Sequence, residues 1–600
     1  MTGQWYTHAI PFRSKIELLN TYNTYPMQKR WFIRETPSDQ VIMELESSLK
    51  VTPLMAALLS QRELHTPESA RTFFKPGLPQ LHDPFLMKDM DRAVERVEKA
   101  VAENQHIMIY GDYDVDGTSA VALVYSVLKD FADVSFYIPD RYEEGYGLSF
   151  RGVEVAKERN ASLLIALDCG IKEMEKVTYA NELGVDVIIC DHHTPGDEIP
   201  DCIVLDPKRS DCGYPFKELC GCGVGFKLMQ AWLEQTGRPV EKAMDHLDLV
   251  AIAIGADIVS LTDENRVLCK LGLEKLNAAP RPGIHALLKH AGKALPLDLS
   301  NVVFIIAPRI NAAGRLESGT RAVELLLATD PKNAEKIAVE IDEYNQNRRI
   351  LDAQITQEAL AQIAEDIDFE GRKSTVVFSS DWHKGVVGIV ASRLIETHYR
   401  PTIVLTESKG VATGSARSVD SFNVYEAILA CEHLLTQFGG HHHAAGLTLP
   451  LENVEAFRHA FDAVVRERMI KEEETPELLI DQEIRLHQLF LAGESAGQVP
   501  RIMKMLEHME PFGPGNNKPV FCVRSVYASA SRVLKEAHLK LDIMDPASGI
   551  IIPAIGFNMA DKADFVAAGC AFDCAFTLET NTWNNRTTLQ FQVRDIRPTV

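Results

Sequence analysis

The chain has 600 residues, which is too long for one hydrophobic core, so we expect about three or four domains. Its net charge of −22 excludes a generally basic nucleic-acid-binding coat but leaves room for a local basic groove. No run of about 18 apolar residues is present, so we expect no membrane span. Eleven scattered cysteines, without a disulfide framework, favour reduced thiols in a cytoplasmic protein.

In chain order, residues 1–36 show little periodicity and are expected to be a loose leader. Residues 37–90 show short amphipathic helices separated by proline and glycine turns, which predict a small helical lead-in. From residue 91 to 319, strand-like and helix-like runs alternate. This alternation is typical of a parallel, doubly wound sheet, so the first large domain is predicted to be α/β.

The second half of the chain begins with residues 320–368, where a 3-4 apolar spacing without proline or glycine from Asn333 to Ile367 predicts a long connecting helix. A second α/β pattern covers residues 369–470. After an acidic joint, residues 471–600 show short β-like runs with turns between them, which suggest a small antiparallel barrel. The predicted fold class is therefore a multidomain α/β protein with a C-terminal β-barrel.

The stretch from 107 to 118 carries the densest acidic signal. An apolar run at 107–110 predicts a buried strand, and Asp112, Asp114 and Asp116 follow it directly. Three like charges so close together are tolerated in water or around a cation. An EF-hand calcium loop is excluded, because its twelfth position is Leu123 and it follows a strand where a helix is required.

Other acidic residues follow other predicted strands of the same domain. Asp168 ends one strand, Asp191, His192 and His193 end another, and Asp257 follows a fourth apolar run that we group with the strands. The carboxyl ends of parallel strands meet at one edge of a sheet, where ligands bind. Each acid alone would more often cap a helix, but their joint position predicts a metal site.

The ligands expected at this edge are carboxylates and imidazole, without thiolate, which favours Mn²⁺ or Mg²⁺. So many carboxylates exceed the needs of one ion and suggest a pair of ions of the kind that hydrolyses phosphoesters. His193 has three roles open to it: metal ligand, partner that orients His192, or proton donor to a leaving oxygen. The cysteines at 202, 212, 220 and 222 lack the paired spacing of a zinc site.

At this point the motifs resemble a known superfamily. The DHH phosphoesterases are matched by G-D-Y-D-V-D-G at 111–117, L-D-C-G at 167–170, D-H-H at 191–193 and G-A-D-I-V at 255–259. Their DHHA1 domain is resembled by P-R-I-N-A-A-G-R-L at 308–316, G-S-A-R-S at 414–418 and G-G-H-H-H-A-A-G at 439–446. Together with P-F-G-P-G-N-N-K-P-V-F at 511–521, the series resembles the RecJ family, exonucleases that degrade single-stranded DNA from its 5′ end.

The resemblance, which covers about residue 45 to the C-terminus, implies roles for individual residues. The matching metal ligands are Asp112, Asp114, Asp116, Asp168, His192 and Asp257, with Asp191 and His193 beside them as catalytic residues. Residues expected near the scissile phosphate are Arg309, Asn311 and Arg315. Residues expected to bind the strand or its phosphates are Arg141, Ser415, Arg417, Ser418 and His441. Arginine suits these roles because it pairs with phosphate oxygens through two parallel hydrogen bonds.

Three points stay open within the resemblance. Smaller DHH enzymes often carry a histidine where this chain has Tyr110, which puts one metal position in doubt. His441–His443 also fit a separate metal-binding tract, although the surrounding glycines favour close approach to a substrate. In the barrel, which we expect to be of the OB type, candidates for binding single strands are Phe512, Phe521, Arg524, Tyr527, Arg532 and Lys540, although aromatic residues of small barrels are usually core.

The resemblance implies a fold of DHH domain, connecting helix, DHHA1 domain and OB-like barrel. It also implies a 5′→3′ exonuclease acting in DNA repair and recombination, with a helicase and a single-strand-binding protein as partners. We expect a monomer that makes no contact with a membrane. One alternative is a DHH phosphodiesterase for oligoribonucleotides or cyclic dinucleotides. A second is a non-catalytic replication scaffold, which predicts lost carboxylates where this chain has kept them.

Overall fold

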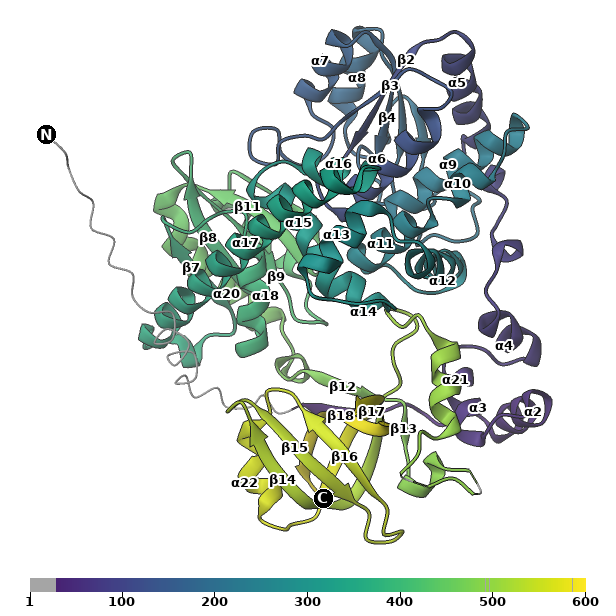
Figure 1. Ribbon diagram of the computed structural model, residues 1–600. Helices are drawn as coiled ribbons and strands as arrows, with labels where there is room; N and C mark the ends of the chain where they lie inside the picture. Colours follow the sequence, from purple (N-terminus) through teal and green to yellow (C-terminus); the bar gives the residue numbers. More distant parts are fainter. Residues whose placement is uncertain (1–28, 492, 496, 585, 600) are drawn as a thin grey trace, which may run out of the picture.

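The chain forms two α/β domains and a β-barrel, with the barrel below the two domains in Figure 1. The computed structural model describes residues 29–599 except 492, 496 and 585. Most of the predicted leader, residues 1–36, therefore lies outside the described residues. In that part of the chain, strands form one two-stranded, two five-stranded and one six-stranded sheet. None of the helices within this part is long and apolar enough to cross a membrane.

The first domain is built on a five-stranded parallel sheet in the order β3-β2-β4-β5-β6. The strands are β2 (His106–Gly111), β3 (Val134–Tyr137), β4 (Ala161–Leu167), β5 (Asp186–Cys190) and β6 (Ile203–Leu205). Counted from β2, this is the doubly wound order 2-1-3-4-5, in which the chain reverses its direction of travel between β2 and β4. The predicted doubly wound sheet is confirmed, and the reversal point marks where a ligand is expected.

Helices cover both faces of this sheet because its strands are apolar on both faces. On one face, Ile107, Ile109 and Leu163 pack in a core with α5, α6 and α9; on the other, Met108 and Leu164 pack with α7 and α8. The helices are α5 (Met90–Ala102), α6 (Val115–Leu128), α7 (Phe150–Glu158), α8 (Met174–Glu182) and α9 (Gly221–Gln235). Successive strand residues thus enter opposite cores, and the sheet is held rigid between them.

The apolar run at 249–254 is a helix, so its grouping with the strands is wrong. It lies inside α11 (Leu247–Asp257), in which every residue from Leu247 to Gly255 is buried. A helix that is apolar on all sides shows no amphipathic period, and a short stretch of it cannot be told from a buried strand. The remaining helices of this region are α10 (Glu241–Met244), α12 (Asp263–Ala278), α13 (Pro282–His290), α14 (Leu299–Asn301), α15 (Ala307–Leu316) and α16 (Gly319–Leu327), with a π-helical turn at Val302–Ile306.

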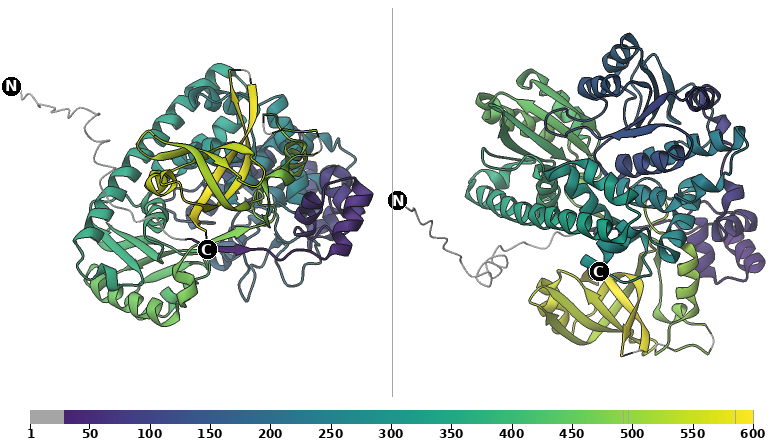
Figure 2. Two further views of the ribbon diagram at one scale, coloured as in Figure 1. Left: turned by 90° about the horizontal axis from the view of Figure 1, so that it is seen from below. Right: turned by 45° about the horizontal axis from the view of Figure 1, so that its top comes forward.

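The long connecting helix is α17 (Pro331–Glu365), which runs along one side of the molecule (Figure 2). Asp330 caps its N-terminus by accepting a hydrogen bond from the Asn333 backbone N–H. Its first half, including Ile337 and Ile341, packs in the core of the first domain. Its second half, including Ile355, packs in a separate core with the second domain. The helix therefore fixes the two α/β domains relative to each other.

The second domain contains a mixed sheet in the order β10-β11-β9-β8-β7, of which only the pair β7–β8 is parallel. Its elements are β7 (Thr375–Ser379), α18 (Val387–Thr397), β8 (Thr402–Ser408), β9 (Val411–Arg417), α19 (Val424–Leu429), β10 (Gln437–His441), β11 (Ala444–Leu449) and α20 (Val454–Arg468). Buried Asp352 on α17 accepts two hydrogen bonds from Arg393 on α18, at 2.7 and 2.8 Å. This bidentate pair ties α18 to the connecting helix.

The C-terminal barrel closes because β14 pairs with both β15 and β17, which confirms the predicted OB-like barrel. Its elements are β13 (Gln482–Glu483), α21 (Arg501–Met509), β14 (Phe521–Leu534), β15 (His538–Met544), β16 (Ile551–Gly556), α22 (Ala563–Ala567), β17 (Phe572–Trp583) and β18 (Arg586–Pro598). The helical lead-in packs on this barrel in one common core that includes Leu45, Met55 and Phe521. The lead-in and the barrel therefore form one packed body.

The lead-in is made of α2 (Asp39–Leu49), α3 (Pro53–Ser60) and α4 (Pro67–Phe74), preceded by β1 (Arg30–Ile33). Strand β1 pairs in parallel with β12 (Glu477–Ile480), which follows the second domain. Trp31 donates a hydrogen bond to Asp595 at 2.8 Å and lies under the guanidinium of Arg597. Segments more than 400 residues apart in the sequence are thus joined. The predicted domain boundaries at 36, 90, 319, 368 and 470 stay predictions.

Arg266 joins the first domain to this packed body. It lies on α12, is only 4% exposed, and stacks on the ring of Phe73 at 3.7 Å. Its guanidinium donates to the backbone carbonyls of Phe73, Met509 and Glu510, among others, at 2.9–3.4 Å. Burial lowers the pKa of Arg266 to about 10. The Arg266 side chain thus donates hydrogen bonds to backbone carbonyls of both the lead-in and the C-terminal region that contains the barrel.

Replacing Arg266 with alanine is expected to lower the free energy of unfolding by about 2–4 kcal/mol, because several buried carbonyls lose a charged donor. Urea denaturation followed by circular dichroism measures this loss. Lys270→Ala on the same helix is the control, since its pair with Glu274 is long and partly exposed and should contribute less than about 1 kcal/mol. Equal effects of the two substitutions would show that Arg266 does not hold the domains together.

Candidate active site

Acidic side chains gather at the carboxyl edge of the first sheet, at its reversal point. Asp112, Asp114 and Asp116 follow β2, and Asp168 follows the neighbouring strand β4. Asp114 caps α6 by accepting a hydrogen bond from the Gly117 backbone N–H at 3.1 Å. A Cβ atom at Gly117 would lie within 2.5–2.9 Å of the Asp112 backbone, so only glycine allows this tight turn. The turn therefore presents three carboxylates to the same edge.

Asp116 is held by the N-terminus of α9, a contact that the sequence motifs did not indicate. Its two carboxylate oxygens accept hydrogen bonds from the backbone N–H groups of Gly221 and Cys222, both at 2.7 Å. The positive end of the helix dipole favours a carboxylate at this point. A Cβ atom at Gly221 would lie 2.5 Å from Oδ1 of Asp168, so the helix approaches both acids closely.

His192 lies among three of these acids. Its Nε2 atom is 3.2 Å from Asp168, 3.6 Å from Asp257 and 3.9 Å from Asp116, measured to carboxylate oxygens. Asp257 comes from the C-terminal end of α11, so the site joins two strand ends, the loop after β5 and one helix end. Asp168 has a left-handed backbone with φ of 61°, a strained conformation of the kind that is found at functional sites.

Without a cation, this cluster of acids is electrostatically unfavourable. Burial, followed by the neighbouring carboxylates, raises the pKa of Asp112, Asp116 and Asp168 well above the usual range and that of Asp257 to about 7. The Oδ1 atoms of Asp112 and Asp168 are buried without any hydrogen-bond partner. Orphaned carboxylate oxygens and an all-oxygen and imidazole donor set fit a hard divalent cation such as Mn²⁺ or Mg²⁺.

Asp168 stands at the centre of this donor set. Its carboxylate lies within 4.8 Å of ligand atoms from Asp112 and Asp114, and also of those from His192 and His193. A further group combines Asp116, His192 and Asp257. The groups Asp112–Asp114–Asp168 and Asp116–His192–Asp257 have no residue in common, so the site offers ligands for two ions. Neither His441–His443 nor the cysteines form such a group within the residues that the structure describes.

His193 has both ring nitrogens engaged. Its Nδ1 atom is 2.7 Å from Oδ1 of Asp191, and its Nε2 atom is 3.1 Å from the hydroxyl of Tyr146. Burial alone would lower the pKa of His193, but the hydrogen bond and charge of Asp191 raise it to about 9. Burial also opposes the charge on Asp191, whose pKa is nevertheless lowered to about 2 by His193. Of the three roles left open for His193, this geometry favours an oriented acid–base group over a metal ligand.

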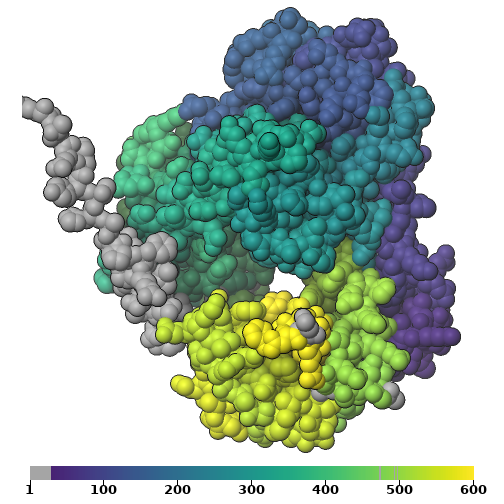
Figure 3. Space-filling model, in the orientation of Figure 1, coloured from purple at the N-terminus to yellow at the C-terminus, as the bar shows by residue number. Residues whose placement is uncertain are grey.

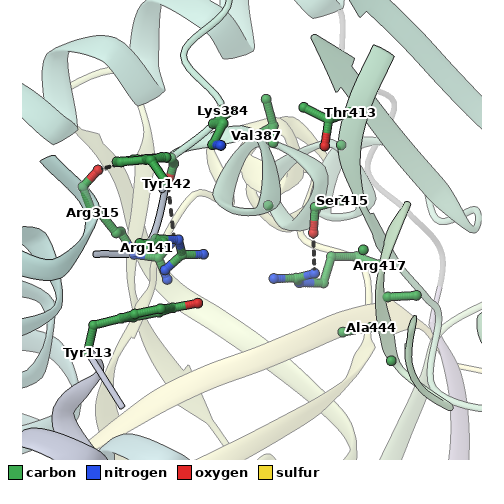
Figure 4. Close-up of a pocket in the computed structure, with 16 residues that line it drawn as sticks. Tyr113, Arg141, Tyr142, Arg315, Lys384, Val387, Thr413, Ser415, Arg417 and Ala444 are labelled. Atoms are coloured by element: carbon green, nitrogen blue, oxygen red, sulfur yellow. Dashed lines mark hydrogen bonds between the residues drawn. The ribbon is translucent and has the colours of Figure 1, made fainter. Parts of the chain in front are cut away.

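A second site lies between the two α/β domains, in a cavity of about 370 Å³ (Figure 4). Four cationic side chains line it, namely Arg141, Arg315, Lys384 and Arg417. The lining contains no carboxylate among the described residues. Arg417 donates to the hydroxyl of Ser415 at 2.7 Å, and Arg141 stacks on the ring of Tyr113 at 4.7 Å. Burial and the neighbouring arginines lower the pKa of Arg315 to about 10. Such a concentration of unpaired cations fits a phosphate group.

A larger groove of about 1090 Å³ adjoins this pocket and reaches the sheet edge. Tyr146, His192, His193 and His441 line it. The groove and the cationic pocket share four lining residues, namely Thr413, Gly414, Gly440 and Gly446. A chain that entered the groove would therefore pass His192 and His193 and end in the cationic pocket.

Three of the predicted site residues lie elsewhere. Arg309 forms an ion pair with Asp342 on the connecting helix at 2.9 Å. Asn311 lies on α15 and lines neither the pocket nor the groove. The hydroxyl of Ser418 donates to the Phe422 carbonyl at 2.5 Å, within its own turn. Arg141, Arg315, Ser415 and Arg417 do meet in one pocket, and their phosphate-binding roles stay predictions.

Several site residues were not predicted from the sequence. Tyr146 and Tyr142 belong to the same stretch as Arg141, but only the arginine was singled out there. Lys384 precedes Gly385 and the start of α18, a lysine-glycine turn before a helix, which was an available signal for phosphate binding. Tyr110, where a histidine was considered, is fully buried and donates to the Gly147 carbonyl at 2.7 Å. It therefore anchors the loop that carries Tyr146.

The aromatic residues expected to bind single strands, Phe512, Phe521 and Tyr527, are buried or half-buried. Phe521 is fully buried in the core, and Arg524 is paired with Glu483 and Asp573. By contrast, Trp583 at the β17–β18 turn is 75% exposed and Phe557 is 52% exposed. These two are the better candidates for stacking on bases.

Comparisons with known proteins agree with this arrangement. Family models match at residues 106–254 (DHH family, N-terminal domain), 370–467 (DHHA1 domain) and 496–595 (RecJ OB domain). The single-stranded-DNA-specific exonuclease RecJ of Bacillus subtilis is 39% identical over 94% of this chain and 70% of its own.

Two crystal structures of RecJ from Thermus thermophilus also match, each over 95% of this chain. The complex with Mn²⁺ has a TM-score of 0.81 at 28% identity and is covered to 80% of its length. The complex with Mg²⁺ has a TM-score of 0.76 at 27% identity and is covered to 79%. The sequence identity, the coverage and the three domain matches together show that the chain belongs to the RecJ family of single-stranded-DNA-specific exonucleases.

Proposed function

We propose that this protein is a metal-dependent exonuclease that hydrolyses single-stranded DNA in the 5′→3′ direction, in DNA repair and recombination. The observation that carries the proposal is the shared wall of the two cavities: the groove lined by His192 and His193 continues into a pocket of four cations. Hydrolysis at the cluster would then release short pieces from the end of the strand that the pocket holds.

The residues that would hold Mn²⁺ or Mg²⁺ are Asp112, Asp114, Asp116, Asp168, His192 and Asp257. Such ions, when bound, supply charge stabilisation to the scissile phosphate and lower the pKa of water at the site. We infer two ions, because these six residues form two ligand groups, one with Asp112, Asp114 and Asp168 and the other with Asp116, His192 and Asp257. The protein's own part is to hold the side chains of the site in place: α9 fixes the ligand Asp116, and Asp191 fixes His193 beside the ligands.

The 5′→3′ polarity follows from the chemistry of DNA ends. A cleaved or newly made strand normally carries a phosphate at its 5′ end and a neutral hydroxyl at its 3′ end. A pocket with four cations and no carboxylate matches the terminal phosphate, which has more charge than an internal phosphodiester. Arg141, Arg315, Lys384 and Arg417 would therefore hold the 5′ end while the next phosphodiester bonds lie along the groove.

The preference for single strands is supported by the barrel. The space-filling view shows an opening between the barrel and the first domain (Figure 3). Exposed Trp583 and Phe557 offer stacking surfaces for unpaired bases, which a duplex does not present. We infer that the barrel holds the strand on the 3′ side of the cleavage site.

The proposal extends to the cellular setting. Work on single strands beside a helicase and a single-strand-binding protein, in the cytoplasm and as a monomer, fits the resemblance described above. Light scattering at micromolar concentration would test the monomer, and pull-down with purified partners would test the contacts.

A strand labelled at one end tests the proposed activity. With Mn²⁺, a 3′-labelled strand of about 40 nucleotides should give a ladder that shortens with time, while a 5′-labelled strand should lose its label at once in short products. The matching duplex should be degraded slowly. Release of the 3′ label first would reverse the polarity, and products from dinucleotides alone would favour the phosphodiesterase alternative.

A further inference from the structure

The loop between β3 and α7, residues 138–149, is held by a dense set of hydrogen bonds. Glu144 accepts hydrogen bonds from the hydroxyl of Tyr137, the backbone N–H of Asp140 and the hydroxyl of Ser149, at 2.8, 2.8 and 2.5 Å. Asp140 accepts from the backbone N–H groups of Tyr142 and Glu143. The loop is thus ordered by its own acidic residues and does not depend on a substrate for its shape.

Within this loop, the backbone aims Tyr146 at the sheet edge. Gly145 and Gly147 on either side have φ of 88° and 86°, in the left-handed region that glycine adopts without strain. The buried hydroxyl of Tyr110 donates to the Gly147 carbonyl at 2.7 Å and fixes the loop on β2. Two glycines and one anchor therefore place one aromatic side chain with precision beside the acidic cluster.

The hydroxyl of Tyr146 touches two groups there. It lies 3.1 Å from Nε2 of His193 and 3.3 Å from the carbonyl oxygen of Asp168. Its ring also meets the His193 ring edge-on, at 5.8 Å between centroids. Asp191, the other partner of His193, cannot rotate, because its oxygens also accept the backbone N–H groups of Ile171, His192 and His193. His193 is thus held at both ring nitrogens, by Asp191 after β5 and by Tyr146 from the loop between β3 and α7.

We propose that Tyr146 is a positioning residue, which acts on the reaction through His193, and this rests on the proposed exonuclease function. The Tyr146 hydroxyl fixes the plane of the His193 ring. Without it, that ring would be free to turn, because the His193 side chain is 45% exposed and lines the groove. The cationic pocket does not depend on this hydroxyl, since none of its four cations contacts Tyr146 in any hydrogen bond of the described residues. The effect should therefore fall on the chemical step and spare the binding of the strand.

Tyr146→Phe tests the inference, because it keeps the ring and removes only the hydroxyl. A well-placed acid–base group contributes about 10²- to 10⁴-fold to a rate, so a loosened one should lose about tenfold in kcat. KM for a 5′-phosphorylated strand should stay within about twofold, since phosphate contacts are untouched. Tyr137→Phe is the matched control: it removes a hydroxyl that anchors the same loop but lies away from His193, and kcat should stay near the wild-type value.

A double-mutant cycle separates action through His193 from a general effect. In a His193→Asn background, Tyr146→Phe should cost nothing further in kcat. Full additivity of the two losses, a normal kcat for Tyr146→Phe, or an equal loss in Tyr137→Phe would each overturn the inference. Wild-type protein without exonuclease activity would instead overturn the proposed function, so the two failures are distinguishable.

Discussion

Asp168→Asn is expected to reduce hydrolysis of single-stranded DNA by at least about 10³-fold while raising the melting temperature of the metal-free protein. Asp168 has a left-handed backbone, and burial, followed by the charges of Asp116 and Asp114, raises its pKa. The amide keeps the size of the side chain but removes the charge that the cations require. Because the same charge is unfavourable without cations, its removal should stabilise the empty fold.

Two measurements check this pair of effects. A radiolabelled or fluorescent strand gives the rate, and differential scanning fluorimetry gives the melting temperature with and without Mn²⁺. Mn²⁺ should raise the melting temperature of the wild type, because an ion that binds only the folded state stabilises it, and should have little effect on Asp168→Asn. Asp197→Asn, at an exposed position in the loop after His193, is the control and should behave as wild type. A destabilised Asp168→Asn protein that still binds Mn²⁺ would contradict the assignment.

Arg417→Ala should lower kcat/KM for a 5′-phosphorylated strand by about 10²-fold and leave a 5′-hydroxyl strand nearly unaffected. Arg417 has no carboxylate partner in the described pocket and is held by the Ser415 hydroxyl and the Ala416 carbonyl, so its charge is free for a ligand. Loss of that charge should therefore abolish the preference for the phosphorylated end. Competition between strands that differ only at the 5′ end measures the preference directly.

Lys409→Ala supplies the control for this result. Lys409 lies in the turn between β8 and β9 of the same sheet, is 68% exposed and pairs with Glu143, so its removal changes the overall charge equally but leaves the pocket intact. Its effect on the preference should be small. If Lys409→Ala and Arg417→Ala weakened both strands alike, the pocket would act as a general electrostatic surface and not as a receptor for the 5′ end.

The metal site could be predicted because it depends on local sequence and one topological rule. Asp116, Asp168 and His192 each follow a short apolar strand, and parallel strands bring such residues to one edge whatever lies between them. The same rule failed for Asp257, which reaches the cluster from a helix end. A fully buried helix and a buried strand have the same apolar composition. The sequence therefore placed Asp257 in the cluster correctly, but on a strand end where the structure has a helix end.

The positions that could not be predicted depend on contacts between distant segments. Arg309 and Arg417 both belong to family motifs, yet the first pairs with Asp342 and the second lies in an open pocket. Nothing local to either arginine decides whether a carboxylate will face it. In the same way, Leu45 and Phe521 share a core although 476 residues separate them, and only the packed structure shows that the lead-in supports the barrel.

The sequence around Tyr146 indicates a turn but not which residues the turn faces. The glycines around it were visible in the sequence and indicated a turn, but the target of the turn depends on where β4 and β5 end. Arg141 and Tyr146 thus extend from one loop into two adjoining cavities. The loop therefore links the cationic pocket with His193, the histidine beside the acidic cluster.

A crystal structure of the protein with Mn²⁺ and a short 5′-phosphorylated strand, solved with anomalous data at the manganese edge, tests the arrangement most directly. We predict two manganese peaks on either side of Asp168, with the terminal phosphate between Arg141 and Arg417 and the chain running along the groove past His193. A strand bound with its 3′ end in the cationic pocket, or manganese away from Asp168, would contradict the proposed site.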